Sequence, residues 1–262
     1  MLKAYIRTLI HSIRPVWPLR RDRLWEVDAL RGIAILMMVV YHLAWDLYGL
    51  AGWDIPIYGL FWSTWQRITA SLFIGLVGVS MYLRAQRLRA KGGWAFRPYL
   101  LRGLVIFSWG MVITLVTYLY QPGEQVRFGI LHFIGVSILL AYPLLRFPLL
   151  GLPLGLLVLL LPRLISWRHG WSWLEWVGLV KNPHPAFDYF PLIPWFGVVL
   201  LGLFLARVCY PRGRRLCSRW PAAPPKGWAW LPLAGQNSLL IYLLHQPVII
   251  LLLTVLGIIP GA

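Results

Sequence analysis

The stretch ALRGIAILMMVVYHLAWDLY, residues 29–48, decides the fold class of this chain. It is apolar over nearly its whole length, and a helix of about 20 such residues can cross a hydrocarbon core of ~30 Å. We therefore predict a membrane-spanning helix here, and we compare the rest of the chain with this segment.

Similar apolar runs recur along the chain. They predict seven spans, at roughly 29–48, 62–83, 100–119, 128–145, 148–163, 190–208 and 235–257. Helices are expected because backbone exposed to lipid must satisfy its hydrogen bonds within the segment. The fifth run is short and proline-rich, so six or eight spans are alternatives. The predicted fold is an all-α, polytopic integral membrane helical bundle with about seven transmembrane helices.

Composition and charge placement agree with a membrane protein. Of the 262 residues, 59% are hydrophobic and 13% are charged, about half the charged fraction of a soluble domain. The net charge of +17 would suggest nucleic-acid binding in a soluble protein. Here the basic residues gather between apolar runs, so we expect membrane flanks and no nucleic-acid partner.

The basic clusters also predict an orientation. They lie in the N-terminal segment, at 84–102 and at 207–226, and these segments share one side of a seven-span chain. The opposite connections hold Asp54, Glu124, Glu175 and Asp188. The positive-inside rule then places the N-terminus inside and the C-terminus outside. The short chain and its basic loops favour a bacterial inner (plasma) membrane.

Two domains are expected. Residues 1–23 form a basic segment whose apolar residues recur at helical spacing, which predicts an interfacial helix ending at Pro15 and Pro18; a disordered tail is the alternative. Residues 24–262 form the transmembrane domain. Cys209 and Cys217 lie in or beside a basic loop, where reduced thiols are expected. No metal-ligand spacing such as CxxC or HExxH is present, so no metal is expected.

Ionisable residues within a span are costly, and four of them lie in the first span or at its mouth. Asp28 and Arg31 share one face at the inner mouth, where they can bind a phosphate or simply form an ion pair. His42 and Asp46 share one face near the outer end, and a carboxylate one turn away can orient an imidazole base. About 16 Å of helix separates Arg31 from His42.

Other polar side chains lie in later spans. His132 is one turn into the fourth span, Asp188 precedes the sixth, and His245 interrupts the seventh. Ser238, Tyr242 and His245 share one helical face. A histidine of this kind is either a packing residue with satisfied hydrogen bonds or a functional group, and the sequence leaves both open.

Three segments resemble a known family. LWEVDALRGIAILMMVVYH, residues 24–42, is similar to the first-helix signature of the transmembrane acyltransferases, including the heparan-α-glucosaminide N-acetyltransferase family and acyltransferase family 3. Arg31 and His42 have the spacing of an Arg and a His that mark the functional site in the latter. FDYFPLIPWFGVVLLG (187–202) and GQNSLLIYLLHQP (235–247) resemble later blocks of bacterial relatives of the heparan enzyme.

The resemblance implies transfer of an acetyl group from cytoplasmic acetyl-CoA to an amine or hydroxyl of an extracytoplasmic sugar or glycan. It places Arg31 near the CoA end of the donor tunnel and makes His42 the base or a transient acyl carrier. We extend the candidate sites to three groups: catalytic His42, Asp46, His132 and His245; donor-binding Arg31, Asp28 and Arg102; acceptor-binding Asp188, Tyr242 and Ser238. Membrane lipid is an expected partner, and relatives of this kind can form homodimers.

Two other functions fit the residues alone. Residues His42, Asp46, His132 and His245 could form the proton relay of a transporter, although no inverted repeat is visible. A catalytically silent membrane partner protein is the third alternative. Binding of CoA would separate the acyltransferase from both.

Overall fold

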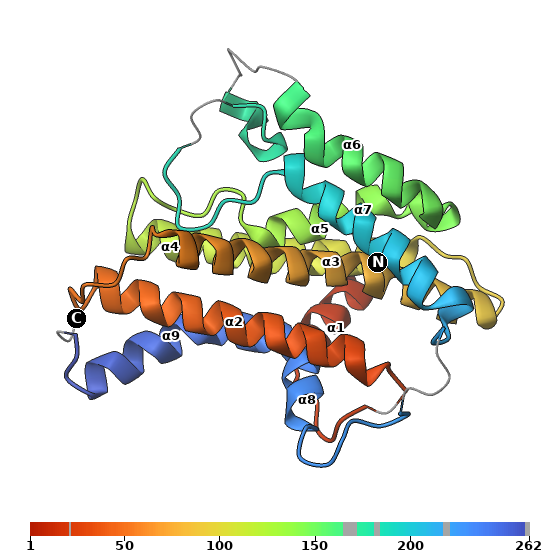
Figure 1. Ribbon diagram of the computed structural model, residues 1–262, viewed down its shortest axis with the longest axis horizontal. Coiled ribbons are helices and arrows are strands. Elements are labelled where there is room, and N and C mark those ends of the chain that lie inside the picture. The colour runs from red at the N-terminus through yellow and green to blue at the C-terminus, as the bar shows by residue number, and fades with distance from the viewer. Residues whose placement is uncertain (21, 165–171, 181–183, 217–220, 260–262) are drawn as a thin grey trace. The chain divides into compact units, whose positions relative to one another are not determined.

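The computed structural model describes residues 1–20, 22–164, 172–180, 184–216 and 221–259, and every regular element in these ranges is a helix (Figure 1). The α-helices are α1 (Leu2–Ser12), α2 (Trp25–Gly49), α3 (Leu60–Ala90), α4 (Arg97–Tyr120), α5 (Ile130–Ala141), α6 (Gly151–Leu164), α7 (Leu192–Cys209), α8 (Trp230–Gln236) and α9 (Ser238–Val255). Short 3-10 helices are η1 (Pro143–Arg146), η2 (Pro148–Leu150), η3 (Ser172–Val177) and η4 (Pro211–Gly213).

Each of the seven apolar runs contains a helix. Five of these helices, α2, α3, α4, α7 and α9, are long and apolar enough to cross a membrane. Helix α5 has 12 residues, and the segment Pro148–Leu164 is also shorter than a full span. The all-helical membrane fold is thus confirmed, whereas the number of crossings and their direction remain predictions.

Two short helices refine the sequence-based picture. Helix α1 covers 11 residues of the basic N-terminal segment and ends before Pro15. Helix α8 begins at Trp230, inside the proline-rich stretch 221–232, and a break at Asn237 separates it from α9. The seventh run is therefore two helices.

Large apolar side chains cover the outside of the long helices. They include Ile33, Val40 and Leu43 on α2, Val112, Leu115 and Leu119 on α4, and Leu244, Leu251 and Val255 on α9, all exposed. In water such faces would be an aggregation liability, but hydrocarbon is their natural solvent.

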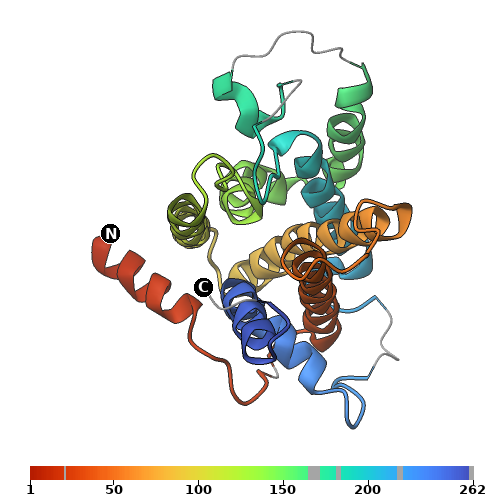
Figure 2. The ribbon, with the colours of Figure 1, turned by 90° about the vertical axis from the view of Figure 1, so that its left-hand side faces the viewer.

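The chain divides into two compact units, and each is described by itself. Unit 1 comprises Met1–Leu9 and Ile74–Ser218, and unit 2 comprises Ile10–Phe73 and Arg219–Ala262. In unit 1, α4 lies beside α5 and α6 beside α7 (Figures 1 and 2). A side chain on Gly103 would meet the Gly135 carbonyl, and one on Gly155 the Gly197 carbonyl. These glycines let the helix backbones approach closely, as small residues do in membrane bundles.

Contacts along the helices show their relative directions. Gly103 approaches Gly135 and Gly110 approaches His132, so α4 and α5 are antiparallel. Helices α3 and α7 run parallel, since Gly78 meets Val199 while residues further along both helices line one cavity. Consecutive spans must alternate in direction, and spans of equal parity must agree. Both pairs obey this requirement of a seven-span chain.

In unit 2, α2 packs against α8 and α9. A side chain on Gly235 would meet the Asp28 carbonyl oxygen, and one on Gly32 the Leu231 carbonyl oxygen. Further along, Ile249 and Leu253 of α9 form a buried cluster with residues of α2. Helix α9 runs parallel to α2, which is again what the first and seventh of seven spans require.

Candidate functional site

Two histidines from different helices face each other in unit 2. The rings of His42 in α2 and His245 in α9 have centroids 4.8 Å apart. His245 Nδ1 lies 2.6 Å from the Tyr242 carbonyl oxygen. A carbonyl only accepts, so Nδ1 carries the hydrogen and Nε2 of the neutral ring offers a lone pair. That buried Nε2 has no hydrogen-bonding partner in the part of the chain that the structure describes.

Asp46 completes this group but contacts α9 in a way that the sequence does not suggest. Its buried carboxylate accepts hydrogen bonds from Gln246 Nε2, 2.9 Å from each oxygen. Helical spacing predicts that this carboxylate orients His42, whereas the ring contacts of His42 are with Tyr41 and His245. Because Gln246 directly follows His245, the Asp46–Gln246 contact fixes the register of α9 against α2 beside the two imidazoles.

Asp28 organises a second polar cluster in unit 2, at the start of α2. Its Oδ1 accepts hydrogen bonds from Arg31 at 2.7 Å and from Arg23 at 2.6 Å, and its Oδ2 accepts one from Gln236 Nε2 at 3.0 Å. The carboxylate is 1% exposed. Arg31 is thus held in an ion pair, which is one of the two alternatives that the sequence leaves open. Ser238, at the start of α9, is buried.

His132 belongs to unit 1 and has both ring nitrogens occupied. Nδ1 accepts a hydrogen bond from the Gly129 backbone at 3.2 Å, and Nε2 lies 3.3 Å from Thr114 Oγ1. This arrangement closes the N-terminus of α5, where orphan backbone donors need partners. The geometry favours a structural role for His132, so His42 and His245 are the stronger catalytic candidates.

The remaining candidates are also in different places. Asp188 Oδ2 accepts a hydrogen bond from the Ile130 backbone at 2.8 Å, beside His132 at the start of α5. Tyr242 lies next to His245, with ring centroids 5.6 Å apart. Arg102 is partly buried in α4. The proposed residues therefore form three groups, two in unit 2 and one around α5 in unit 1, with Arg102 apart from them.

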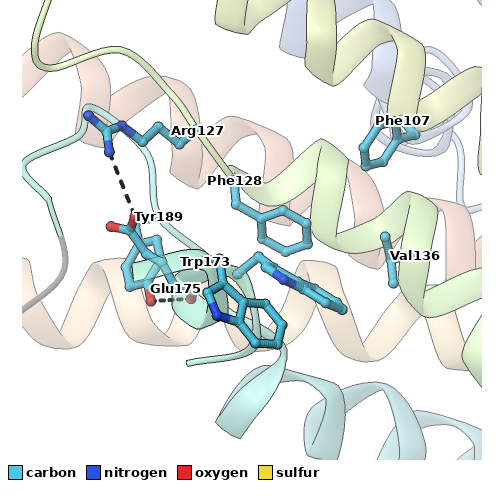
Figure 3. A pocket seen from close by; sticks show the side chains of 8 residues that line it. Phe107, Arg127, Phe128, Val136, Trp173, Glu175 and Tyr189 are labelled. Carbon is cyan, nitrogen blue, oxygen red and sulfur yellow. Dashed lines mark hydrogen bonds and ion pairs between the residues drawn. The ribbon is translucent and has the colours of Figure 1, made fainter. Parts of the chain in front are cut away.

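An aromatic cavity in unit 1 is a feature that the sequence does not predict (Figure 3). It has a volume of about 440 Å³ and is lined by Phe107, Arg127, Phe128, Val136, Trp173, Glu175, Trp176 and Tyr189. Phe107 and Phe128 also flank the ring of His132. The WSWLEW run (171–176) offers a signal, but tryptophans at such a position are equally typical of a membrane belt.

Polar groups hold one side of this cavity in place. Glu175 Oε2 lies 3.9 Å from Arg127 Nη1 and 3.1 Å from His184 Nδ1. The Tyr189 hydroxyl donates to the Glu175 carbonyl oxygen at 2.7 Å. Burial, assisted by the nearby Glu175 charge, raises the pKa of Tyr189 to about 12, so the phenol stays protonated at neutral pH. The cavity thus combines aromatic faces with one carboxylate and one guanidinium.

Comparison with known proteins identifies a family. The family model described as heparan-alpha-glucosaminide N-acetyltransferase, catalytic, matches residues 23–247. That range contains His42, Asp46, His245 and Gln246, the aromatic cavity and the Asp28 cluster. No curated protein and no solved structure gives a significant match to the chain.

Proposed function

We propose an acetyl transfer for this chain, which belongs to the heparan-α-glucosaminide N-acetyltransferase catalytic family of membrane acetyltransferases. In this proposal it moves an acetyl group from acetyl-CoA to an amine or hydroxyl of a sugar. The donor approaches from the cytoplasmic side, where the basic clusters are predicted, and the acceptor lies on the outer side. The membrane is the bacterial inner membrane in this proposal.

The unpartnered Nε2 of His245 beside His42 carries the proposal. Acyl transfer to an amine needs a base to remove a proton as the nitrogen attacks the thioester carbonyl carbon. The carbon–nitrogen bond forms, the carbon–sulfur bond breaks, and the proton passes to the CoA thiolate. An imidazole with a free lone pair can both accept and return this proton, and the ring of His42 lies beside it, with centroids 4.8 Å apart.

The aromatic cavity supports a sugar as acceptor. Flat aromatic faces such as those of Trp173 and Trp176 suit the apolar faces of a sugar ring, while Glu175 and Arg127 offer partners for hydroxyl or amino groups. Its volume, about 440 Å³, falls within the usual range for small-molecule sites. Asp188, Tyr242 and Ser238 remain proposed acceptor contacts, and Arg31, Asp28 and Arg102 remain proposed donor contacts.

The test is release of CoA thiol by purified protein supplied with acetyl-CoA and a panel of amino sugars. Loss of a general base typically costs about 100- to 10,000-fold in rate. We expect losses in this range for His245→Ala and for His42→Ala, while His11→Ala in α1 serves as a matched control and keeps full turnover. Full turnover of both folded site variants would remove the histidine pair from the mechanism.

The same assay tests the acceptor site. Trp173→Ala removes one aromatic face of the cavity, so we expect a higher KM for the amino sugar and an unchanged KM for acetyl-CoA. The exposed Trp228, which belongs to unit 2, provides the control Trp228→Ala. Equal acceptor KM values in both variants would place the acceptor elsewhere.

A further inference from the structure

Four arginines from separate parts of unit 1 line one cavity of about 270 Å³. They are Arg89 near the end of α3, Arg146 in η1, Arg207 near the end of α7 and Arg212 in η4. Tyr82, Gln86 and Pro148 complete the lining. The helix ends and turns around the cavity lie on the side of the membrane that the basic clusters predict to be cytoplasmic. We call this the arginine cavity.

The helices present this lining by their geometry. Tyr82, Gln86 and Arg89 are spaced i, i+4 and i+7, so they share one face of α3. Tyr82 is 1% exposed and forms the floor. Arg89 is anchored, since its Nη2 donates to the Leu145 carbonyl oxygen at 3.2 Å and its guanidinium lies 4.3 Å from the centroid of Trp94. One wall of the cavity is therefore a face of α3, and Arg89 on that face is held in place by its contacts.

Within the described part of unit 1, no acidic residue balances these charges. Unit 1 contains Glu124, Glu175 and Asp188, and none of them lines the arginine cavity. Glu175 pairs with Arg127, and Asp188 caps α5 at Ile130. Those contacts lie at the N-terminal end of α5, whereas Arg146 follows its C-terminal end, about 18 Å of helix away. Four guanidiniums around one space repel one another, and a bound anion would relieve this repulsion.

Membrane topology alone does not explain why these four arginines line one cavity. Positive-inside topology requires arginines near the inner surface, but it does not require them to converge. Arg87, Arg97 and Arg214 are exposed like Arg89, Arg146 and Arg212 and lie in the basic clusters at 84–102 and 207–226, yet they do not line the cavity. Arg31, in turn, is already bound by Asp28.

We propose that the arginine cavity is a phosphate-binding site. Guanidinium groups bind phosphate oxygens in bidentate geometry, and Tyr82 and Gln86 can add hydrogen bonds. A volume of about 270 Å³ is at the lower limit for small-molecule sites, so a phosphate-bearing head group enters while the rest of its molecule lies outside. The phosphates belong either to the nucleotide end of the acyl-CoA donor or to an anionic lipid; the donor assignment rests on the proposed function, and the phosphate site does not.

The experiment measures binding to the purified full-length protein in neutral detergent. The probes are adenosine 3′,5′-bisphosphate, which carries donor-type phosphates without a thioester, and a soluble short-chain phosphatidylglycerol. The variant Arg146→Gln/Arg207→Gln/Arg212→Gln removes three guanidiniums from the cavity. Its matched control, Arg87→Gln/Arg97→Gln/Arg214→Gln, removes the same charge from the same basic segments.

We expect at least one probe to bind the wild type and the control. The cavity variant should bind it about 1,000-fold more weakly, because removing each of three charge-assisted hydrogen bonds weakens binding roughly tenfold. Preference for the bisphosphate assigns the donor, and preference for the lipid assigns a head group. Should the triple variant not fold, Arg207→Lys keeps the charge, loses the bidentate geometry and should bind several-fold more weakly. Equal weakening in variant and control, or no binding of either probe to the wild type, overturns the site.

The outcome is independent of catalysis. Thiol release is not the readout, so an inactive chain that binds the bisphosphate in the cavity refutes acyl transfer and leaves the phosphate site standing. Conversely, an active chain whose cavity variant binds both probes normally refutes the site alone.

Discussion

Some polar residues of unit 2 are paired across helices. Asp46 and Gln246 form a buried polar contact between α2 and α9, beside His42 and His245. A buried carboxylate without its hydrogen-bond donor keeps the cost of desolvation but has no compensating partner. The pair therefore stabilises the packing that brings the two imidazoles together.

At this scale, Gln246→Leu should destabilise the protein by about 2–4 kcal/mol, because the carboxylate of Asp46 is left unsatisfied. The double variant Asp46→Leu/Gln246→Leu should recover most of that stability, since both polar partners are gone. The free energy of unfolding of the single and the double variant is measured in mixed micelles by raising the fraction of denaturing detergent. The exposed Gln66→Leu is the control and should be nearly neutral. Equal destabilisation of the single and double variants would contradict a direct interaction.

At the scale of elements, close packing of α8 on α2 positions the Asp28 cluster. A side chain on Gly235 would meet the Asp28 carbonyl oxygen, so only glycine permits this approach. The same approach brings Gln236 Nε2 within 3.0 Å of Asp28 Oδ2. Helix α8 therefore supplies one of the three side chains that bond to Asp28, although it is only seven residues long.

Gly235→Ala should consequently cost about 1–3 kcal/mol of stability, because α8 must move away from α2. Gly49→Ala, at the end of α2, is the matched control: nothing lies within 4 Å of its added methyl group, and the higher helix propensity of alanine should stabilise by up to about 1 kcal/mol. Thermal unfolding of both variants checks the contrast. If Gly235→Ala were as stable as the control, the close approach of these helices would not hold.

At the scale of the whole molecule, the two ends of unit 1 differ in chemistry. The arginine cavity lies at the ends of α3 and α7, and the aromatic cavity lies beyond the start of α5 and before α7. A seven-span chain places the first on the cytoplasmic side and the second on the outer side. Such polarity suits an enzyme whose anionic donor and sugar acceptor come from opposite sides of the membrane.

Labelling of single cysteines with a membrane-impermeant thiol reagent tests this polarity. In a background carrying Cys209→Ser and Cys217→Ser, Gln121→Cys in the α4–α5 connection should react in intact cells. Arg87→Cys, near the end of α3, should react only after permeabilisation. Both positions are exposed, so access to the reagent depends on the side of the membrane. The reverse pattern would invert the orientation, and reaction at both sites in intact cells would exclude the seven-span topology.

Hydrophobicity and charge placement along the sequence are sufficient for the fold class, because a lipid environment admits few backbone structures. The helical nature of all seven runs could be predicted because it depends on residues close in sequence, and the family could be predicted from three separate segments. The pairing of Asp28 with Arg31 was one of two alternatives that the sequence left open. Hydrogen-bond partners that are distant in sequence could not be predicted. Spacing favours Asp46 as the support for His42, yet Asp46 bonds to Gln246, 200 residues away.

The sequence by itself therefore determined that this is a helical membrane protein of an acetyltransferase family with ionisable groups in its first and last spans. Only the tertiary structure decided which side chains meet. Among the described residues, one ring nitrogen of His245 has no hydrogen-bond partner while both nitrogens of His132 are bonded, and four arginines distant in sequence line one cavity. The physical reason is that helix formation and membrane insertion are local properties of a segment. Hydrogen-bond partners and shared cavities depend on which helix faces meet, and that is set by packing between distant parts of the chain.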